Sequence, residues 1–282
     1  MIAGALRLQF DFLLMGRDIA LGTVASSCIN NLVRPVTESR PVVTLPGFAA
    51  SARSHSPMVG FLNQCGFSAQ TFSPGFPSEK AIPDFVRDLE PTLGKLIKEL
   101  ADKHGTPVSL VGQSAGGLYA RLFAADCPQE IDRVVTLGAP TNDPAQSTTP
   151  NRALEYLVKR ISGTAGFDAL AGEGGLLHWP ANSPELPFVA ICSPLDGAVD
   201  ERAALIPAET VLRSSQSAPR ENLRVHCSHF GMAYNPFVML AVADRLGQQK
   251  QQWTDFSPQR YFPKWPKRVI SRVFPDPDGN PV

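Results

Sequence analysis

Short apolar runs alternate with longer stretches of helical periodicity along most of the chain. Runs of four to six residues rich in Val, Leu, Ile and Phe, bounded by Gly, Pro or polar residues, are typical of buried strands. Six such runs predict strands at residues 42–45, 67–72, 108–111, 134–137, 188–192 and 223–226.

Between these runs, apolar residues recur at steps of three and four, as they do on one face of a helix. This spacing predicts helices at residues 58–62, 85–100, 118–125 and 236–246, the second of them kinked at Pro91. Asn235 followed by Pro236 is a strong helix start, because Asn caps free amides and Pro fits the first turn. Since strands and helices alternate, we expect an α/β fold with a mostly parallel central sheet flanked by helices.

The first 40 residues are expected to form a helical extension. Apolar residues fall near helical spacing at Leu6, Phe10, Leu13 and Leu14, which favours a helix that packs these residues on the domain. A peripheral membrane or lid-like element is the alternative. Arg7 and Asp11 interrupt the apolar run, and no uncharged run reaches the roughly 18–20 residues of a membrane span. We therefore expect neither a signal peptide nor an integral membrane span.

The regular alternation is lost between residues 138 and 187, where Pro, Gly, Ser and Thr are frequent. We interpret this stretch as a cap or lid insertion. The segment 253–282 is rich in Pro and aromatic residues, so we expect it to lie over the surface rather than to fold separately. A single domain over residues 1–282 is therefore expected, which suits a chain of this length.

The net charge bears on which partners the protein can attract, and the cysteine content bears on the redox state of its compartment. The 26 basic and 26 acidic residues cancel, so no overall field attracts nucleic acid or an anionic membrane. The cysteines are odd in number and widely spaced, which suits free thiols better than a disulfide framework: Cys28, Cys65, Cys127, Cys192 and Cys227. A reducing, cytoplasmic location is expected, and partners must be inferred from a site.

The segment 112–116, Gly-Gln-Ser-Ala-Gly, lies where a predicted strand passes into a predicted helix. Its glycines permit a sharp turn, and parallel sheets bind ligands at the carboxyl ends of their strands. A Ser in this G-x-S-x-G context is typical of a catalytic nucleophile exposed on a strand-turn-helix. Ser114 is therefore the candidate nucleophile, and a helix cap without chemistry is the alternative.

A serine needs a base to become nucleophilic. His229 follows the last predicted strand on a loop that leads to the final helix, from which its ring can reach the strand ends, so we prefer it as the base. His226, inside the predicted strand, is the alternative. The remaining histidines are expected to be solvated or to cap helices: His55, His104 and His178.

The base in turn needs a carboxylate that orients it. The predicted strand 188–192 runs into Ser-Pro-Leu-Asp-Gly-Ala-Val-Asp, which offers Asp196 and Asp200. Asp196 comes first after the strand, and the following glycine permits a turn that aims its carboxylate back, so it is preferred. Asp200 is expected to cap a short helix. The chain order serine, aspartate, histidine is the one typical of G-x-S-x-G enzymes.

Acyl transfer also needs amide donors for a developing oxyanion. The amide of Ala115 is one candidate, and the amide of Phe48, on the loop after the first strand, is the other. The alternative for that loop is an ordinary Pro-Gly turn. The substrate site is expected to be lined by the Phe48 ring and by Gln113, Phe167, Leu177 and Trp179.

Metal and nucleotide chemistry are not expected. His226, Cys227 and His229 with Cys192 form a grouping of soft ligands, but their spacing fits no standard zinc pattern, and neighbours on a strand point to opposite faces. The chain also has no glycine motif of the kind that cradles phosphates.

Five ordered landmarks between residues 41 and 246 carry a resemblance to a known family: VVTLPGF, GQSAG, VVTLGAP, SPLDGAV and SHFGMAYNP. Together they resemble the α/β-hydrolase superfamily, on the side of the bacterial lipases and esterases. The resemblance implies the α/β-hydrolase fold, a Ser-Asp-His triad, a two-amide oxyanion hole and no metal or organic cofactor. Many lipases have His-Gly where this chain has Pro46-Gly47, which argues against a true triglyceride lipase.

These residues predict hydrolysis of a small-molecule carboxylic ester through an acyl-enzyme. The apolar side chains of the cap favour an apolar acyl or alcohol group, although they could instead cover the core. The same triad would serve an acyltransferase, or the hydrolysis of thioesters, lactones, amides or polyesters. A non-catalytic binding protein of this fold is a further alternative.

Overall fold

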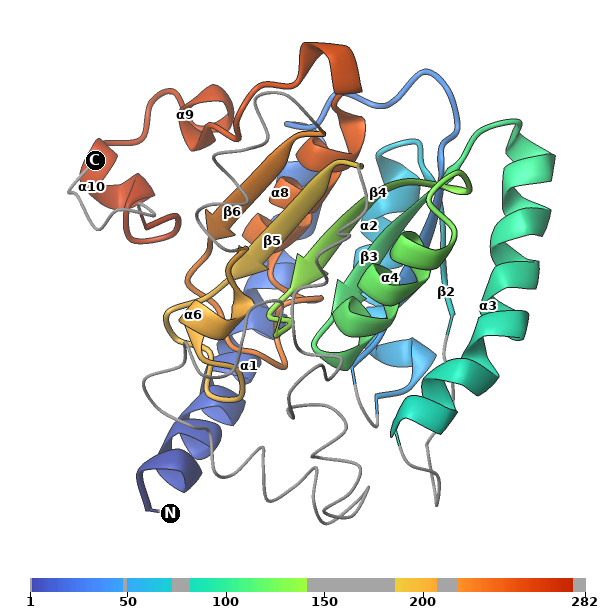
Figure 1. Cartoon of the computed structure of the whole chain (residues 1–282). Coiled ribbons are helices and arrows are strands. Elements are labelled where there is room, and N and C mark those ends of the chain that lie inside the picture. Colours follow the sequence, from blue (N-terminus) through green and yellow to red (C-terminus); the bar gives the residue numbers. More distant parts are fainter. Residues whose placement is uncertain (1, 48–49, 73–81, 141–185, 207–217, 276–282) are drawn as a thin grey trace.

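The computed structural model describes residues 2–47, 50–72, 82–140, 186–206 and 218–275. Within them, six strands form one parallel sheet in the order β2-β1-β3-β4-β5-β6 (Figure 1). The strands are β1 Pro41–Leu45, β2 Ser68–Thr71, β3 Val108–Gln113, β4 Ile131–Leu137, β5 Phe188–Cys192 and β6 Arg220–Arg224. The predicted parallel sheet is confirmed.

Helices cover both faces of the sheet (Figure 1). The longer helices are α1 Ile2–Asn30, α2 Ser56–Gln64, α3 Ile82–His104, α4 Ala115–Asp126 and α8 Pro236–Gly247. The shorter ones are η1 Ala52–His55, α6 Glu201–Ala204, η4 Lys250–Gln252, α9 Pro258–Tyr261 and α10 Lys267–Ile270. Helices α3 and α4 pack on one face, and α2 and α8 pack on the other.

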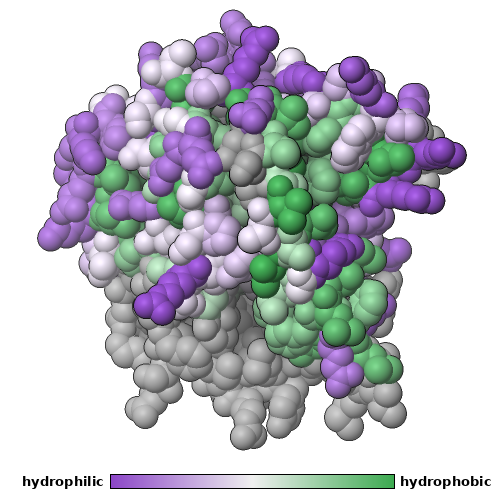
Figure 2. Space-filling view, turned by 180° about the vertical axis from the view of Figure 1, so that it is seen from behind, coloured by the Kyte–Doolittle hydropathy of each residue, from purple (hydrophilic) through white to green (hydrophobic). Residues whose placement is uncertain are grey.

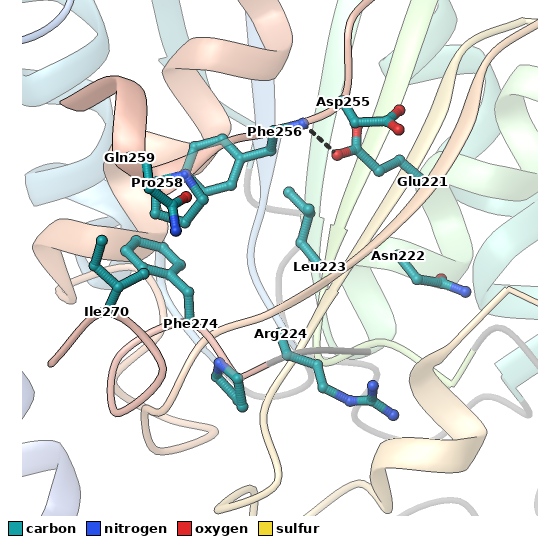
Figure 3. A pocket seen from close by; sticks show the side chains of 11 residues that line it. Glu221, Asn222, Leu223, Arg224, Asp255, Phe256, Pro258, Gln259, Ile270 and Phe274 are labelled. Atoms are coloured by element: carbon teal, nitrogen blue, oxygen red, sulfur yellow. Dashed lines mark hydrogen bonds between the residues drawn. The ribbon is translucent and has the colours of Figure 1, made fainter. Parts of the chain in front are cut away.

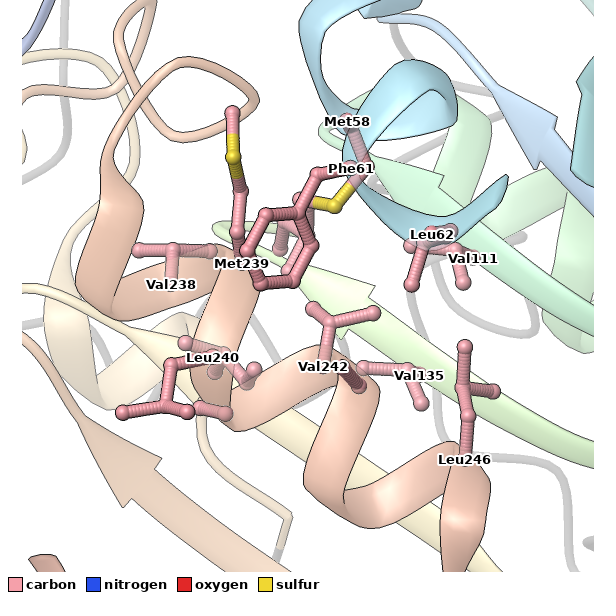
Figure 4. Close-up of a cluster of buried hydrophobic side chains, with 14 of the residues drawn as sticks. Met58, Phe61, Leu62, Val111, Val135, Val238, Met239, Leu240, Val242 and Leu246 are labelled. Atoms are coloured by element: carbon pink, nitrogen blue, oxygen red, sulfur yellow. The ribbon is translucent and has the colours of Figure 1, made fainter. Parts of the chain in front are cut away.

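The strands have apolar side chains on both faces because both faces are covered. In β1, Val42 packs with α2 and α8, and Val43 packs with α3 and α4. Figure 4 shows the first of these cores, where Met58, Phe61 and Leu62 of α2 lie against side chains of α8 and the sheet. Because both faces of the central strands are buried, near-continuous apolar runs in the sequence were enough to predict these strands.

The register of the sheet aligns the carboxyl ends of its strands. Leu45 lies beside Gly112, Gln113 lies beside Leu137, and Leu137 lies beside Ile191. The segments that follow β1, β3, β4 and β5 consequently leave the sheet at the same edge. This is the edge at which open parallel sheets place their ligands.

Helix α1 packs on the protein through a face that the apolar spacing did not predict. Of the four residues expected to pack, Leu14 is half-buried, but Leu6, Phe10 and Leu13 are exposed, Leu13 at 75%. Asp11 and Asp18 are instead fully buried, together with Gly22 and Ile29 further along the helix. Figure 2 shows the resulting apolar surface at the lower right, where the reversed view places the N-terminal part of α1.

That expectation was wrong because the buried face of α1 presents the acceptor oxygens of Asp11 and Asp18 to the loops beneath it, while Leu6, Phe10 and Leu13 point to solvent. The amides of those loops need hydrogen-bond partners, which buried carboxylates provide. None of the described helices combines the length and the hydropathy needed to cross a bilayer.

The last strand begins and ends earlier than predicted. His226 lies beyond β6, where its main-chain amide donates to the Val273 carbonyl and its Nδ1 lies 2.8 Å from the Arg272 carbonyl oxygen. The C-terminal segment thus lies against this end of the sheet, and its side chains Phe262, Ile270 and Phe274 join the core. Residues 141–185, most of the expected cap, lie outside the described residues.

We predict that Leu62→Ala lowers the free energy of unfolding by about 2–5 kcal/mol, because Leu62 is fully buried between α2 and the sheet. Leu13→Ala removes the same atoms from an exposed position on α1 and is expected to change that energy by less than about 0.5 kcal/mol. Denaturant unfolding of both variants measures the difference. Equal losses would contradict the assignment of these two faces.

Candidate active site

Ser114 sits on a strained turn between β3 and α4. Among the described residues it is the one non-glycine with a positive φ, at 53°, with ψ at −123°. Its side chain makes no capping hydrogen bond to α4, and the left-handed backbone is not that of an ordinary helix cap. Strain of this kind, on the order of 1–3 kcal/mol, persists where surrounding structure enforces it.

Two glycines make this turn possible. A Cβ on Gly116 would collide with the carbonyl oxygen of Leu45, and a Cβ on Gly112 would collide with the backbone of Gly116. Strand β1 and the start of α4 therefore approach each other more closely than side chains would allow. The G-x-S-x-G spacing is explained by contacts on both sides of Ser114.

The neighbouring strand ends surround Ser114. Its amide donates to the Leu137 carbonyl of β4 at 2.9 Å. On the other side, a Cβ on Gly47 would lie 3.1 Å from the Ser114 Cβ, so the loop after β1 passes directly beside the serine. Phe48, the expected second oxyanion donor, lies outside the described residues. Ala115, the expected first donor, begins α4, where helix amides have no partner within the helix.

Asp196 and His229 form a buried pair. Nδ1 of His229 lies 2.7 Å from Oδ2 of Asp196, and the two side chains are 4% and 2% exposed. The other carboxylate oxygen accepts the amides of Ala198 and Val199 at 2.8 and 2.7 Å. These bonds fix the carboxylate, so the histidine donates from Nδ1 and keeps Nε2 for a second partner.

Asp200, the alternative acid, has another role. It precedes α6, and its side chain accepts the amide of Arg202 at 3.0 Å, as the sequence predicted for a helix cap. The hydrogen-bond partners of the two aspartates distinguish their roles: Asp196 binds a ring nitrogen of His229, and Asp200 binds a main-chain amide of a helix.

The environment of His229 favours its charged form. Burial of the ring opposes protonation, but the Asp196 charge, the hydrogen bond to Asp196 and the Asp11 charge outweigh burial. Together they raise the pKa of His229 above its ordinary value of 6.5. A base surrounded in this way readily keeps a proton that it has accepted.

Gly138 connects this pair to the sheet. It directly follows β4 and has a φ of 53°. A Cβ on Gly138 would lie 2.8 Å from Asp196 Oδ2 and 3.1 Å from His229 Nδ1. The acid–base pair therefore lies over the end of β4, the strand that pairs with β3 and bonds to the amide of Ser114.

Gln113 joins the strand that carries Ser114 to the loop that carries His229. Its amide nitrogen donates to the His229 carbonyl at 2.6 Å, and its amide oxygen lies 2.9 Å from Nε2 of His55. Both polar ends of Gln113 are thus used within the protein, which favours a positioning role over the expected contact with substrate.

His55 was expected to be solvated or to cap a helix. It stands at the N-cap position of α2, although its side chain makes no capping hydrogen bond, and the expectation of a solvated side chain was wrong. The residue is fully buried, and burial lowers its pKa to about 4, against the smaller opposing effect of Gln113. A neutral ring that donates from Nε2 matches the acceptor that Gln113 presents. Pairing with a residue 58 positions away leaves no local signal in the sequence.

Asp11 and Asp18 were also missed. They lie seven residues apart on α1, so one helix face presents both carboxylates to the loops beneath it. In the sequence, Asp11 was interpreted only as an interruption of an apolar run that argues against a membrane span, and Asp18 was not considered. The same observation, an acid at helical spacing within an apolar run, could have indicated a buried acceptor.

The other expected substrate contacts, Phe167, Leu177 and Trp179, lie outside the described residues. A pocket of about 260 Å³ is present elsewhere, between β6 and the C-terminal segment (Figure 3). Glu221, Leu223 and Phe274 line it, and none of the candidate catalytic residues does. Within the described part of the chain, no three His, Cys, Asp or Glu side chains are grouped as metal ligands.

No protein-family profile matches the chain, and no curated protein matches it. Solved structures do. An esterase from Pyrococcus furiosus matches with a TM-score of 0.54 and 17% identity, over 76% of this chain and 83% of the other. Inhibited esterase B from Lactobacillus rhamnosis matches with a TM-score of 0.53 and 15% identity, over 78% and 81%.

A soluble variant of monoglyceride lipase from Saccharomyces cerevisiae, in complex with a substrate analogue, matches with a TM-score of 0.52 and 15% identity, over 78% of this chain and 90% of the other. At such identities the likeness concerns the fold. Together with the parallel sheet and its flanking helices, these matches show that the chain has the fold of the α/β-hydrolase superfamily.

Proposed function

We propose that the protein is a carboxylic ester hydrolase that works through Ser114, His229 and Asp196. The observation that carries the proposal is the convergence of three segments at one edge of the sheet. A strained serine follows β3, and a buried acid–base pair lies over the end of the adjacent β4. An α/β-hydrolase fold brings no chemistry by itself, so the proposal depends on this site.

In the proposed reaction, Ser114 Oγ attacks the ester carbonyl carbon while Nε2 of His229 takes the hydroxyl proton. The tetrahedral oxyanion is bound by the amides of Ala115 and Phe48. His229 then gives the proton to the leaving alcohol, and the acyl group stays on Ser114. Water, activated by His229, releases the acid and restores the serine.

Asp196 serves this reaction by holding His229 in the tautomer that leaves Nε2 free for Ser114. Its charge also stabilises the imidazolium that forms in each half of the reaction, which agrees with the raised pKa of His229. Gln113 supports the same ring indirectly, because its side-chain amide donates to the main-chain carbonyl of His229, and His55 in turn binds the side chain of Gln113.

Esters are the substrate class that we favour over amides and thioesters. The solved structures with this fold include two esterases and a monoglyceride lipase, which supports an ester without identifying it. We propose that Phe48, Phe167, Leu177 and Trp179 supply an apolar site for the acyl or alcohol group, as expected from the sequence.

Ser114→Ala is expected to lower kcat for p-nitrophenyl esters by on the order of 10⁴-fold or more, because no other group can form the acyl-enzyme. It should also abolish labelling by a fluorophosphonate probe. Ser109→Ala, which removes a hydroxyl from the same strand, is the matched control and should keep both activities. Equal labelling of the wild type and Ser114→Ala, or no labelling of either, would contradict the proposal.

Asp196→Asn is expected to lower kcat by on the order of 10⁴-fold, because an amide favours the wrong tautomer of His229. Asp200→Asn should leave kcat nearly unchanged, since Asn caps a helix as well as Asp does. Steady-state kinetics of the two variants give the comparison. If Asp200→Asn were the inactive variant, the acid would be misassigned.

The pH dependence of kcat/KM should reflect the raised pKa of His229. Only the neutral ring can accept a proton, so activity falls as pH decreases through this pKa. Because the pKa is raised, the midpoint of the acid limb should lie above 6.5. Initial rates from pH 5 to 9 measure it, and a midpoint below 6.5 would contradict a pKa of His229 raised by its two acidic neighbours.

A further inference from the structure

We propose that Asp11, on the N-terminal helix, is a positioning residue for the acid–base pair. Its carboxylate binds the main chain of the loop that carries Asp196 and of the loop that carries His229, and so holds the two catalytic side chains together. The inference rests on the proposed function, and it assigns to α1 a part in the active site.

The contacts of Asp11 carry the argument. One carboxylate oxygen accepts the amide of Gly197 at 2.7 Å and the amide of His229 at 2.8 Å. The other accepts the amide of Phe230 at 3.3 Å. Asp11 is fully buried. Gly197 directly follows Asp196, so a single oxygen atom bridges the two catalytic loops, which are about 30 residues apart in the chain.

The helix fits these loops closely. A Cβ on Gly197 would collide with the Arg7 carbonyl and would lie 2.8 Å from the Asp11 Cβ. Phe12 stacks on Phe230 with ring centroids 4.8 Å apart, and Phe230 meets the His229 ring edge-on at 5.2 Å. A shift of α1 would therefore move the main chain on both sides of the pair and the ring that supports the base.

Charge gives Asp11 a second effect on His229. Two carboxylate charges act on the imidazole, that of Asp196 through a direct hydrogen bond and that of Asp11 from α1, and both favour the protonated ring. Burial raises the pKa of Asp11 itself, the amides of His229 and Gly197 oppose that rise, and the Asp196 charge adds to it. The imidazolium that forms in the proposed reaction is thus stabilised by the charges of two acids.

Asp18 offers a matched control on the same helix. It is equally buried, and it accepts the amide and hydroxyl of Ser228 at 2.8 and 2.7 Å and the side-chain amide of Asn235 at 3.0 Å. Arg17 also pairs with it, at 2.9 Å. Its partners flank the base loop without including either catalytic residue or Gly197. Losing Asp18 should therefore cost stability without changing the titration of His229.

The experiment compares Asp11→Asn and Asp18→Asn by NMR titration of the His229 ring and by ester hydrolysis. Asparagine keeps an acceptor oxygen at position 11 and removes the charge. We expect Asp11→Asn to lower the pKa of His229, to move the acid limb of kcat/KM to lower pH, and to reduce kcat/KM roughly 10- to 100-fold. Asp18→Asn should leave the pKa of His229 at its wild-type value, even if this variant loses as much in melting temperature as Asp11→Asn does.

A pKa of His229 in Asp11→Asn that equals the value in Asp18→Asn would overturn the inference. The titration of the His229 ring can be measured whether or not the protein hydrolyses esters. An inactive wild type would therefore refute the proposed function, and the titration would still test the role of Asp11. If Asp11→Asn does not fold, amide exchange in the wild type decides: the Gly197 and His229 amides should exchange slowly and together. Exchange as fast as in exposed loops would refute the role of Asp11.

Discussion

The parallel pairing of β3 with β1 and β4 is the constraint on which the candidate site depends. It brings the carboxyl ends of these strands to one edge, so that Gly47, Ser114 and Gly138 become neighbours although they are far apart in the chain. Each of these positions follows directly on a strand or its turn. The apolar side chains that bury the sheet on both faces thus also determine where the polar chemistry is placed.

The site contains several features that reduce stability when considered alone. Ser114 has a strained backbone, and Asp11, Asp18 and Asp196 are acids taken out of water. Each acid is compensated by hydrogen-bond donors, which are mostly main-chain amides of loops for Asp11 and Asp196 and mostly side chains for Asp18. In the described residues these loops lack a regular ladder of hydrogen bonds, and the carboxylates supply the acceptors that a ladder would give. The same bonds that offset burial also fix the groups that we propose to be catalytic.

The sequence predicted the structure correctly where apolar periodicity and the types of residue at the turns indicated the same elements. Apolar runs located the strands, and the glycines around Ser114 indicated the turn. It failed where burial was achieved by polar atoms: spacing predicted that Leu13 packs on the domain, and Asp11 was interpreted only as an interruption of the apolar run, whereas Leu13 is exposed and Asp11 is buried. His55 was missed for the same reason, because its partner Gln113 is remote in sequence. Apolar periodicity reflects which side chains are buried by the hydrophobic effect. It does not indicate which hydrogen-bond acceptors, distant in the sequence, the main-chain amides of a loop will need.

A crystal structure of the protein after reaction with a phosphonate ester identifies the nucleophile, because the adduct imitates the tetrahedral intermediate. We expect a covalent bond between phosphorus and Ser114 Oγ. We also expect a phosphonyl oxygen that accepts the Ala115 amide, and Nε2 of His229 at about 3 Å from the ester oxygens while Nδ1 stays on Asp196. An adduct on another side chain, or a His229 ring turned away from the bound phosphonate, would refute the proposed roles of Ser114 and His229.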